Sequence, residues 1–162
     1  MDNHDEEYLQ FSIVRLRFRE SVRDSPMPEF LDVPGRAIGG IYQSLDFLES
    51  VKIGTHGDFV KFGTTGLFGS ILWDPRNGSV VQSGKNMTHA AMVNTSLERF
   101  SLCVHGVIDR YPFEADEGGD GWGAAARDVE DFLIRSDPES YAIEGNLWYE
   151  VRWDIENGDF DH

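Results

Sequence analysis

Apolar positions in the middle of the chain form short runs separated by turn residues, a pattern typical of antiparallel strands. The runs cover residues 59–62, 68–73, 79–82 and 90–93. The second and third runs flank Asp74-Pro-Arg-Asn-Gly78, in which proline presets φ and Asn-Gly favours the left-handed backbone that closes a hairpin. Strands joined by turns of this kind predict an antiparallel meander.

Before the meander the pattern is less regular. Apolar and charged residues alternate from Val14 to Glu20, which predicts a half-buried strand, with a short amphipathic helix as the alternative. Ser25-Pro-Met-Pro28 ends that element, because proline lacks the amide hydrogen that a regular element needs. We expect residues 29–50 to be irregular, apart from a short helix near Leu45–Glu49.

After the meander the apolar positions recur at helical spacing. Thr95-Ser-Leu-Glu98 fits a capping box, and a helix is predicted over residues 96–108. Further helices are predicted over residues 124–135, after the Asp137-Pro138 start, and in the last segment up to Gly158. Strands followed by helices, with no linker long enough to divide them, predict that the whole chain is a single α+β domain.

Length and net charge limit the possible functions. A chain of 162 residues suits one domain with a sizeable core. Its formal net charge of −15 argues against a protein that grips nucleic acid, because that work needs a basic face. The same charge argues against docking on an anionic membrane surface.

The negative charge is concentrated in the last third of the chain. Residues 109–162 hold 16 acidic and 4 basic side chains, a net charge of −12, whereas residues 1–108 have a net charge of −3. Composition leaves two explanations open. The charge either keeps the protein in solution or forms an acidic face that attracts a basic partner. Such a field raises association rates by roughly 10- to 1000-fold at low salt.

The cysteine count and the N-terminal sequence predict a cytoplasmic protein. Cys103 is the one cysteine of the chain, so an internal disulfide is excluded. The acidic start Met1-Asp-Asn-His-Asp-Glu-Glu7 differs from a secretory signal. No apolar run in the sequence approaches the roughly 18 residues of a membrane helix.

Few residue patterns point to catalysis or to a metal. Cys103 and His105 lie two positions apart on a predicted helix, so their side chains point to different faces. The glycines from Gly63 to Gly69 lack the Lys-Ser/Thr pair of a phosphate-binding loop, and no Cys or His spacing matches a zinc site. We therefore expect no cofactor and no metal.

An acidic, glycine-rich loop between two predicted helices is the strongest candidate for a binding surface. It runs from Tyr111 to Gly123. Trp122 either fills a gap in the core and anchors this loop or makes an exposed contact, since aromatic residues ringed by charge are frequent interface anchors. The acidic residues of the loop are Glu114, Asp116, Glu117 and Asp120.

The last predicted helix carries two tryptophans in different positions. Trp148 shares the apolar stripe of Val151 and Ile155, so we expect it in the core. Trp153 lies off that stripe. The sequence leaves open whether Trp153 packs on a neighbouring element or lies at an interface.

Three parts of the chain, taken together and in order, resemble the SUKH superfamily. Leu72-Trp-Asp-Pro-Arg-Asn-Gly-Ser-Val-Val81 is similar to its strand–turn–strand segment. Asn94-Thr-Ser-Leu-Glu-Arg-Phe100 is similar to the helix entry of its actinobacterial immunity branch. The Asp137-Pro138 region and Trp148-Tyr-Glu-Val-Arg-Trp-Asp-Ile-Glu-Asn-Gly158 resemble the C-terminal helix of that branch, where an aromatic pair precedes an acidic end.

The resemblance covers about residues 28–158 and leaves residues 1–25 without a counterpart. It implies a twisted, mainly antiparallel sheet flanked by helices. It also implies an immunity protein, which binds a cognate bacterial toxin domain and blocks it without being an enzyme. The toxins of such systems are often nucleases with basic substrate grooves, and the superfamily shares no catalytic residues.

We therefore expect the protein to neutralise a toxin domain with a basic surface. We expect neither nucleic acid nor a membrane as partner, and the oligomeric state stays open. Two alternatives remain: a regulatory protein-interaction module of the same fold, and an enzyme of unknown class that uses His56 and Asp58. The residues predicted to bind the partner are Glu114, Asp116, Glu117, Asp120, Trp122, Asp154 and Glu156.

Overall fold

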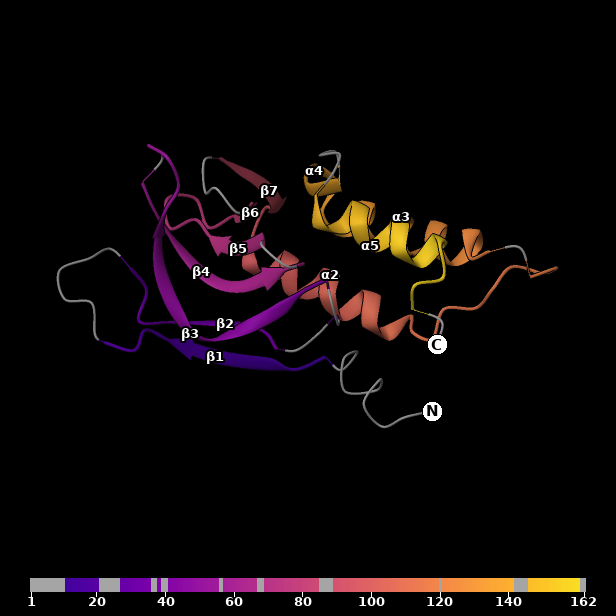
Figure 1. The fold of residues 1–162 in the computed structure, drawn as a ribbon, viewed down its shortest axis with the longest axis horizontal. Helices are drawn as coiled ribbons and strands as arrows, with labels where there is room; N and C mark the ends of the chain where they lie inside the picture. Colours follow the sequence, from indigo (N-terminus) through magenta and orange to yellow (C-terminus); the bar gives the residue numbers. More distant parts are fainter. Residues whose placement is uncertain are drawn as a thin grey trace.

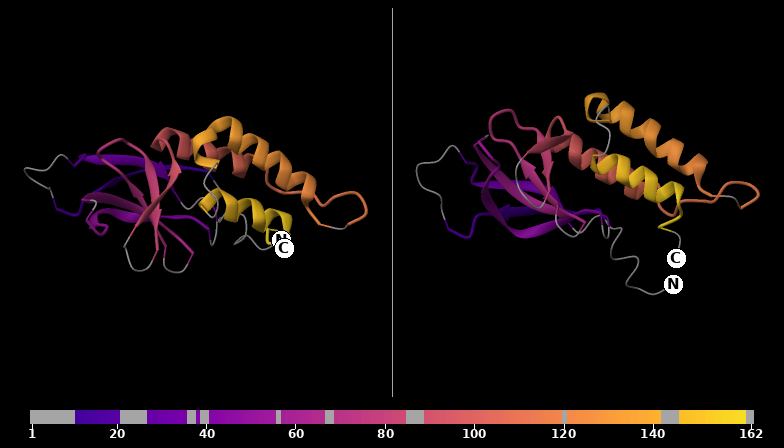
Figure 2. Two further views of the ribbon diagram at one scale, coloured as in Figure 1. Left: turned by 90° about the horizontal axis from the view of Figure 1, so that it is seen from above. Right: turned by 45° about the horizontal axis from the view of Figure 1, so that its top comes forward.

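In the computed structural model of the protein, strands come first along the chain and helices last (Figure 1). The sheet occupies one end of the molecule and the helices the other, as the two further views confirm (Figure 2). The structure describes residues 11–20, 27–35, 38, 41–55, 57–66, 69–84, 89–119, 121–141 and 146–160.

The main sheet is a five-stranded antiparallel meander whose strands pair in chain order. Figure 1 shows that it is strongly twisted, and the meander predicted from the apolar runs is confirmed. Its strands are β3 (Gln43–Lys52), β4 (Asp58–Thr65), β5 (Gly69–Trp73), β6 (Val80–Ser83) and β7 (Ala90–Asn94).

The predicted turn between β5 and β6 closes as its sequence indicates. The backbone oxygen of Asp74 accepts a hydrogen bond from the Gly78 amide at 2.7 Å, and the Asp74 amide donates to the Ser79 oxygen at 2.8 Å. Gly78 has a φ of 78°, a conformation that glycine adopts without steric cost. Glycine at this position therefore lets β6 return beside β5.

A second, two-stranded sheet lies beside β3. It consists of β1 (Ile13–Arg17) and β2 (Phe30–Pro34) in antiparallel pairing. A bridge between Phe18 and Leu48 joins it to β3. Of the two alternatives for the alternating N-terminal pattern, the strand is confirmed.

The helix predicted near Leu45–Glu49 is wrong, because this segment belongs to β3. Leu48 is 3% exposed, whereas its neighbours Phe47 and Glu49 face solvent. Leu48 is thus the one fully buried residue of β3, with exposed residues on both sides of it. The pairing of β3 with β4 also shifts register between Ser44 and Glu49, so no unbroken alternation marks the strand in the sequence.

The predicted helices of the C-terminal half are confirmed. In the described part of the chain, α3 packs against both α2 and α5, and α3 and α5 lie side by side (Figures 1 and 2). No helix in the described ranges is long and apolar enough to cross a membrane. The helices are α2 (Leu97–Asp109), α3 (Gly123–Ser136), α4 (Pro138–Tyr141) and α5 (Leu147–Glu156).

The start of α2 differs by one residue from the predicted capping box. Ser96 is the N-cap, and its hydroxyl accepts a hydrogen bond from the Arg99 amide at 3.1 Å. The Thr95 hydroxyl instead donates to Asp137 Oδ1 at 3.1 Å. A contact between residues 42 positions apart therefore determines which hydroxyl caps the helix.

The core lies between the sheet and the helices and has Phe100 of α2 at its centre. The Phe100 ring lies 5.1 Å from that of Tyr42, 5.7 Å from that of Phe62 and 5.9 Å from that of Trp148, between centroids. Trp148 is 1% exposed, as predicted from its place on the apolar stripe. These contacts join the sheet, α2 and α5 into one α+β domain.

A buried polar network ties β7 to the later helices. The Asn94 amide nitrogen donates to Asp137 Oδ2 at 3.0 Å, and its Oδ1 accepts from Trp148 Nε1 at 2.8 Å. The Thr95 amide also donates to Asp137 Oδ2, at 2.8 Å. Because every group of this set is paired, it can be buried without a large free-energy cost.

Candidate partner-binding surface

The loop between α2 and α3 extends from the end of the molecule opposite the sheet (Figures 1 and 2). The C-terminal end of α5 lies at the base of this loop. A ring contact between Phe113 of the loop and Phe160, with centroids 5.6 Å apart, links the two segments. The acidic residues predicted from the loop and from the last helix therefore share one end of the molecule.

Asp116 lies inside the loop and caps α3. Its Oδ2 accepts a hydrogen bond from the Gly123 amide at 3.0 Å, and its Oδ1 accepts from the Ala124 amide at 2.9 Å. Trp122, at the N-cap position of α3, provides no side-chain acceptor. Asp116 therefore supplies the negative charge that a helix N-terminus favours.

The loop is also closed by its own backbone. The Asp116 amide donates to the Gly121 oxygen at 2.8 Å, and the Gly119 amide donates to the Asp116 oxygen at 3.0 Å. Gly118, Gly119 and Gly121 have positive φ values. Glycines at these positions let the chain turn back on itself at the tip of the loop.

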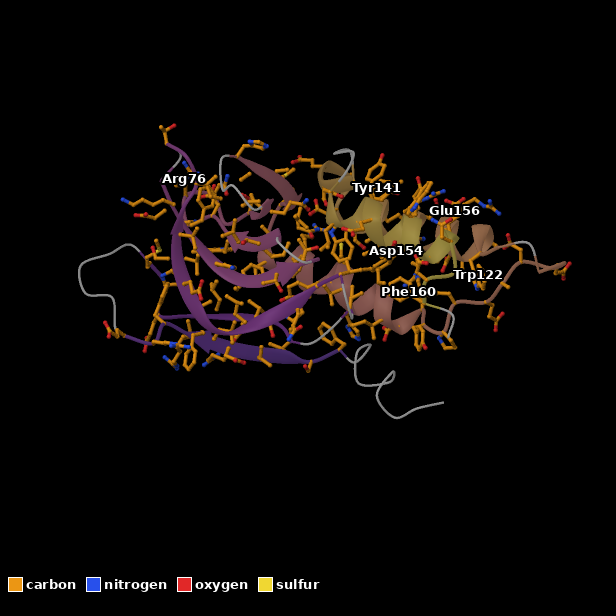
Figure 3. All side chains as sticks on the ribbon, viewed as in Figure 1. Arg76, Trp122, Tyr141, Asp154, Glu156 and Phe160 are labelled. Atoms are coloured by element: carbon orange, nitrogen blue, oxygen red, sulfur yellow. The ribbon has the colours of Figure 1, made fainter. Side chains whose placement is uncertain are left out.

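Trp122 is half-buried and packs against the turn that follows α5. A side chain at Gly158 would overlap its six-membered ring. Gly158 itself has a φ of 75°, so the turn is shaped to receive the indole. Trp122 thus anchors the loop, one of the two roles the sequence left open, and Figure 3 labels it at the same end of the molecule as Glu156 and Phe160.

The two predicted acids of α5 lie in different surroundings. Glu156 is half-buried and accepts a hydrogen bond from Arg152 Nη1 at 2.6 Å, while Arg152 Nε donates to Glu130 Oε2 of α3 at 2.8 Å. For Asp154, partial burial and a hydrogen bond with the Asp159 carboxyl raise the pKa to about 6. Glu156 therefore holds the Arg152 side chain that braces α5 against α3, whereas Asp154 holds a proton more tightly than usual.

The seven predicted residues therefore differ in how far they are available to a partner. Glu114 and Glu117 are exposed, Asp116, Trp122, Asp154 and Glu156 are half-buried, and Asp120 lies outside the described residues. The exposed acids of the C-terminal third that make no ion pair within the described residues are Glu114, Glu117, Asp131, Glu139, Glu150 and Asp159.

Sequence reasoning did not assign Trp153, which is 62% exposed on α5. The sequence feature that sets Trp153 apart is its spacing from Trp148, since five residues turn the side chain by about 140° around a helix. That offset removes Trp153 from the apolar stripe. It does not say whether another element covers the indole, and only the packing of α5 shows that most of it faces solvent.

The residues named for the enzyme alternative, His56 and Asp58, are not seen to form a site within the described part of the chain. His56 lies outside the described residues, and Asp58 is exposed at the first position of β4.

The buried Cys103 accepts a hydrogen bond from Asn94, and burial raises the pKa of its thiol to about 12. Such a thiol stays protonated near neutral pH and is a poor nucleophile.

Two of the three parts of the chain that were compared with the SUKH superfamily meet in the interior. Asn94 comes from the helix-entry segment, Asp137 from the Asp-Pro segment and Trp148 from the last helix. Hydrogen bonds join Asn94 to both of the others.

Within the described ranges, no three His, Cys, Asp or Glu side chains are grouped so as to hold a metal ion. Comparisons of the chain with protein-family models, with curated proteins and with solved structures found no match.

Proposed function

We propose that the protein is an immunity protein of the SUKH type that binds a cognate bacterial toxin domain and blocks it without catalysing a reaction. The observation that carries this proposal is the meeting of two acidic segments at one end of the molecule. The 111–122 loop and the end of α5 are distant in sequence, yet the Trp122–Gly158 and Phe113–Phe160 contacts hold them together.

The loop is suited to binding because it is held in place before a partner arrives. Asp116 fixes it to the start of α3, and Trp122 fixes it to the turn after α5. Glu114 and Glu117 are exposed on this support. A preorganised loop loses less conformational entropy on binding than a flexible one, so its exposed carboxylates can contribute more of their interaction energy to affinity.

The charge of this surface favours a basic partner. Residues 109–162 have a net charge of −12, which would steer a basic surface into contact and repel nucleic acid. A nuclease-like toxin needs a basic groove to hold its substrate. We therefore propose that the acidic surface covers that groove and so competes with the substrate for it.

The test is survival of cells that express a nuclease-like toxin domain from a gene neighbouring that of this protein, where such a gene is found. Co-expression of the wild-type chain should restore growth, and a variant carrying Glu114→Gln and Glu117→Gln should restore it less well. The matched control carries Asp46→Asn and Glu49→Gln, which removes two exposed carboxylates from β3 instead.

The outcomes separate the candidate functions. The proposal is supported if the wild type and the β3 control protect the cells and the loop variant protects them less well. Absence of any protection, although the purified chain is folded, contradicts the immunity function. Protection that coincides with turnover of a substrate by the chain would favour the enzyme alternative. Binding of a non-toxin protein through the same surface would favour the regulatory module.

A further inference from the structure

Trp153 is the most exposed of the large apolar side chains in the described part of the molecule, at 62% of its full exposure. Trp148 in the same helix is 1% exposed, and its Nε1 donates to Asn94. No acceptor for the Trp153 Nε1 is found among the described residues. An indole left in water on a well-formed helix has apolar area and a hydrogen-bond donor that a partner could cover.

The neighbours of Trp153 on α5 are acidic or polar. Residues three or four positions away on a helix lie on the same face, and for Trp153 these are Tyr149, Glu150, Glu156 and Asn157. Glu150 is exposed and makes no ion pair with the described residues. The exposed indole thus has acidic residues, Glu150 and Glu156, on its own face of the helix.

The positive charge closest in sequence, Arg152, is neutralised. It pairs with Glu156 on its own helix and with Glu130 on α3, at 2.6 and 2.8 Å. Together with Glu150 and Asp154, Arg152 and its two partners form a set of five residues that has four carboxyls and one guanidinium. Even where Asp154 is protonated, these five residues carry an excess of negative charge.

The helix that presents Trp153 is held in place. Asn146 caps its first turn by accepting hydrogen bonds from the Trp148 and Tyr149 amides. The Tyr149 ring stacks on Tyr141 with centroids 4.9 Å apart, and Arg152 braces α5 against α3. A rigid aromatic anchor is a frequent source of binding energy at protein interfaces.

From this arrangement we propose that Trp153 is the anchor of a docking site for an arginine- or lysine-bearing protein surface. The site consists of Trp153 with Tyr149, Glu150, Glu156 and Asn157. A guanidinium over the indole face gains from a cation–π interaction, and Glu150 can pair with the same cation. This proposal deepens the proposed function and rests on it for the identity of the partner as a toxin.

A nona-arginine peptide tests the site without a toxin. Binding is measured by isothermal titration calorimetry at low salt, and the indole N–H signals are followed by NMR. We expect the Trp153 signal to shift and that of the buried Trp148 to stay in place. Trp153→Ala should weaken peptide binding about two- to fivefold, as expected for a cation–π contact at an exposed site. Trp153→Phe should retain part of the affinity.

Two matched charge variants locate the effect. Glu150→Gln lies beside Trp153, and Glu139→Gln removes an equally unpaired, exposed carboxylate from α4. We expect a larger loss of affinity for Glu150→Gln. Equal affinities of wild type and Trp153→Ala would overturn the proposal, as would equal losses for the two charge variants. Circular dichroism establishes that each variant is folded.

The toxin rescue assay separates this proposal from the proposed function. If Trp153→Ala weakens both peptide binding and rescue, both stand. If the wild type rescues cells and Trp153→Ala rescues equally well, the immunity function stands and the docking site is wrong. If peptide binding depends on Trp153 but the wild type does not rescue, the docking site stands and the toxin partner is wrong.

Discussion

Asp116 caps the helix that begins at Gly123, and its Oδ2 accepts a hydrogen bond from the Gly123 amide at 3.0 Å. An acid from the middle of the charged loop is thus part of the scaffold. Its neighbour Glu117 is exposed and makes no ion pair within the described ranges. Two adjacent carboxylates therefore have different tasks, and substitutions should separate them.

Asp116→Ala should lower the free energy of unfolding by about 1 kcal/mol, the usual effect of losing a helix N-cap. Glu117→Ala serves as the control and should change it by less than about 0.5 kcal/mol, as for most exposed positions. Urea unfolding followed by circular dichroism measures both. Equal values for the two variants would mean that the Asp116 contact does not stabilise α3.

Gly158→Ala should be more destabilising than Gly118→Ala. Both glycines have positive φ, 75° and 96°, so alanine costs roughly 1–2 kcal/mol at either site. At Gly158 the new methyl group also overlaps the Trp122 ring, whereas Gly118 has open space around it. The overlap adds about 1–3 kcal/mol.

The double variant Trp122→Ala/Gly158→Ala isolates this contact. Removing the indole should abolish the extra cost of alanine at Gly158, which a double-mutant cycle of unfolding free energies measures. Additive effects of the two substitutions would show that Trp122 and Gly158 are not coupled, and the anchoring role of Trp122 would then be wrong.

Asp137→Ala should lower the free energy of unfolding by about 3 kcal/mol, because it leaves the buried donor of Asn94 and the partly buried donor of Thr95 without their acceptor. Asp137 is 3% exposed. Asp131→Ala removes an exposed acid of α3 and should have a small effect. A loss below about 1 kcal/mol for Asp137→Ala would mean that the network contributes little to the fold.

The raised pKa of Asp154, about 6 against an ordinary 3.8, predicts a pH dependence of stability. Between these values the folded state holds a proton that the unfolded state has released, so this group destabilises the fold progressively as the pH rises from about 4 to about 6. Asp154→Asn removes the contribution. The stability of the variant relative to wild type should therefore increase over that range and then level off.

A carboxyl titration by NMR gives the direct control for Asp154. Its pKa should be near 6 in the wild type and lower in Asp159→Asn, because the neighbouring carboxyl contributes to the shift. An Asp154 pKa near 4 in the wild type, or a pKa unchanged by Asp159→Asn, would contradict the assigned cause.

Local signals in the sequence were enough to predict most of the fold. The Asp74–Gly78 turn and the helical spacing after Asn94 each depend on neighbouring residues, and both predictions are confirmed. The strand through Leu48 was missed because its register shift interrupts the alternation. The cap at Ser96 was misplaced because Thr95 bonds to Asp137, which is distant in sequence.

The candidate surface could be predicted only in part, since its residues meet through tertiary contacts. The acidic composition of the loop and of the last helix was visible in the sequence. The capping role of Asp116 depends on how the loop folds back on α3. The exposure of Trp153 depends on which elements pack around α5, and a helical repeat alone does not contain that information.

The most direct test of the central claim is the rate of association with the toxin domain that the chain neutralises in the rescue assay, measured by stopped flow over a range of salt concentrations. We predict that Glu114→Gln/Glu117→Gln slows association at low salt and flattens its dependence on salt, whereas Asp46→Asn/Glu49→Gln on β3 changes neither. An association rate and a salt dependence equal to those of the wild type would contradict the claim that the acidic loop guides the protein to its partner.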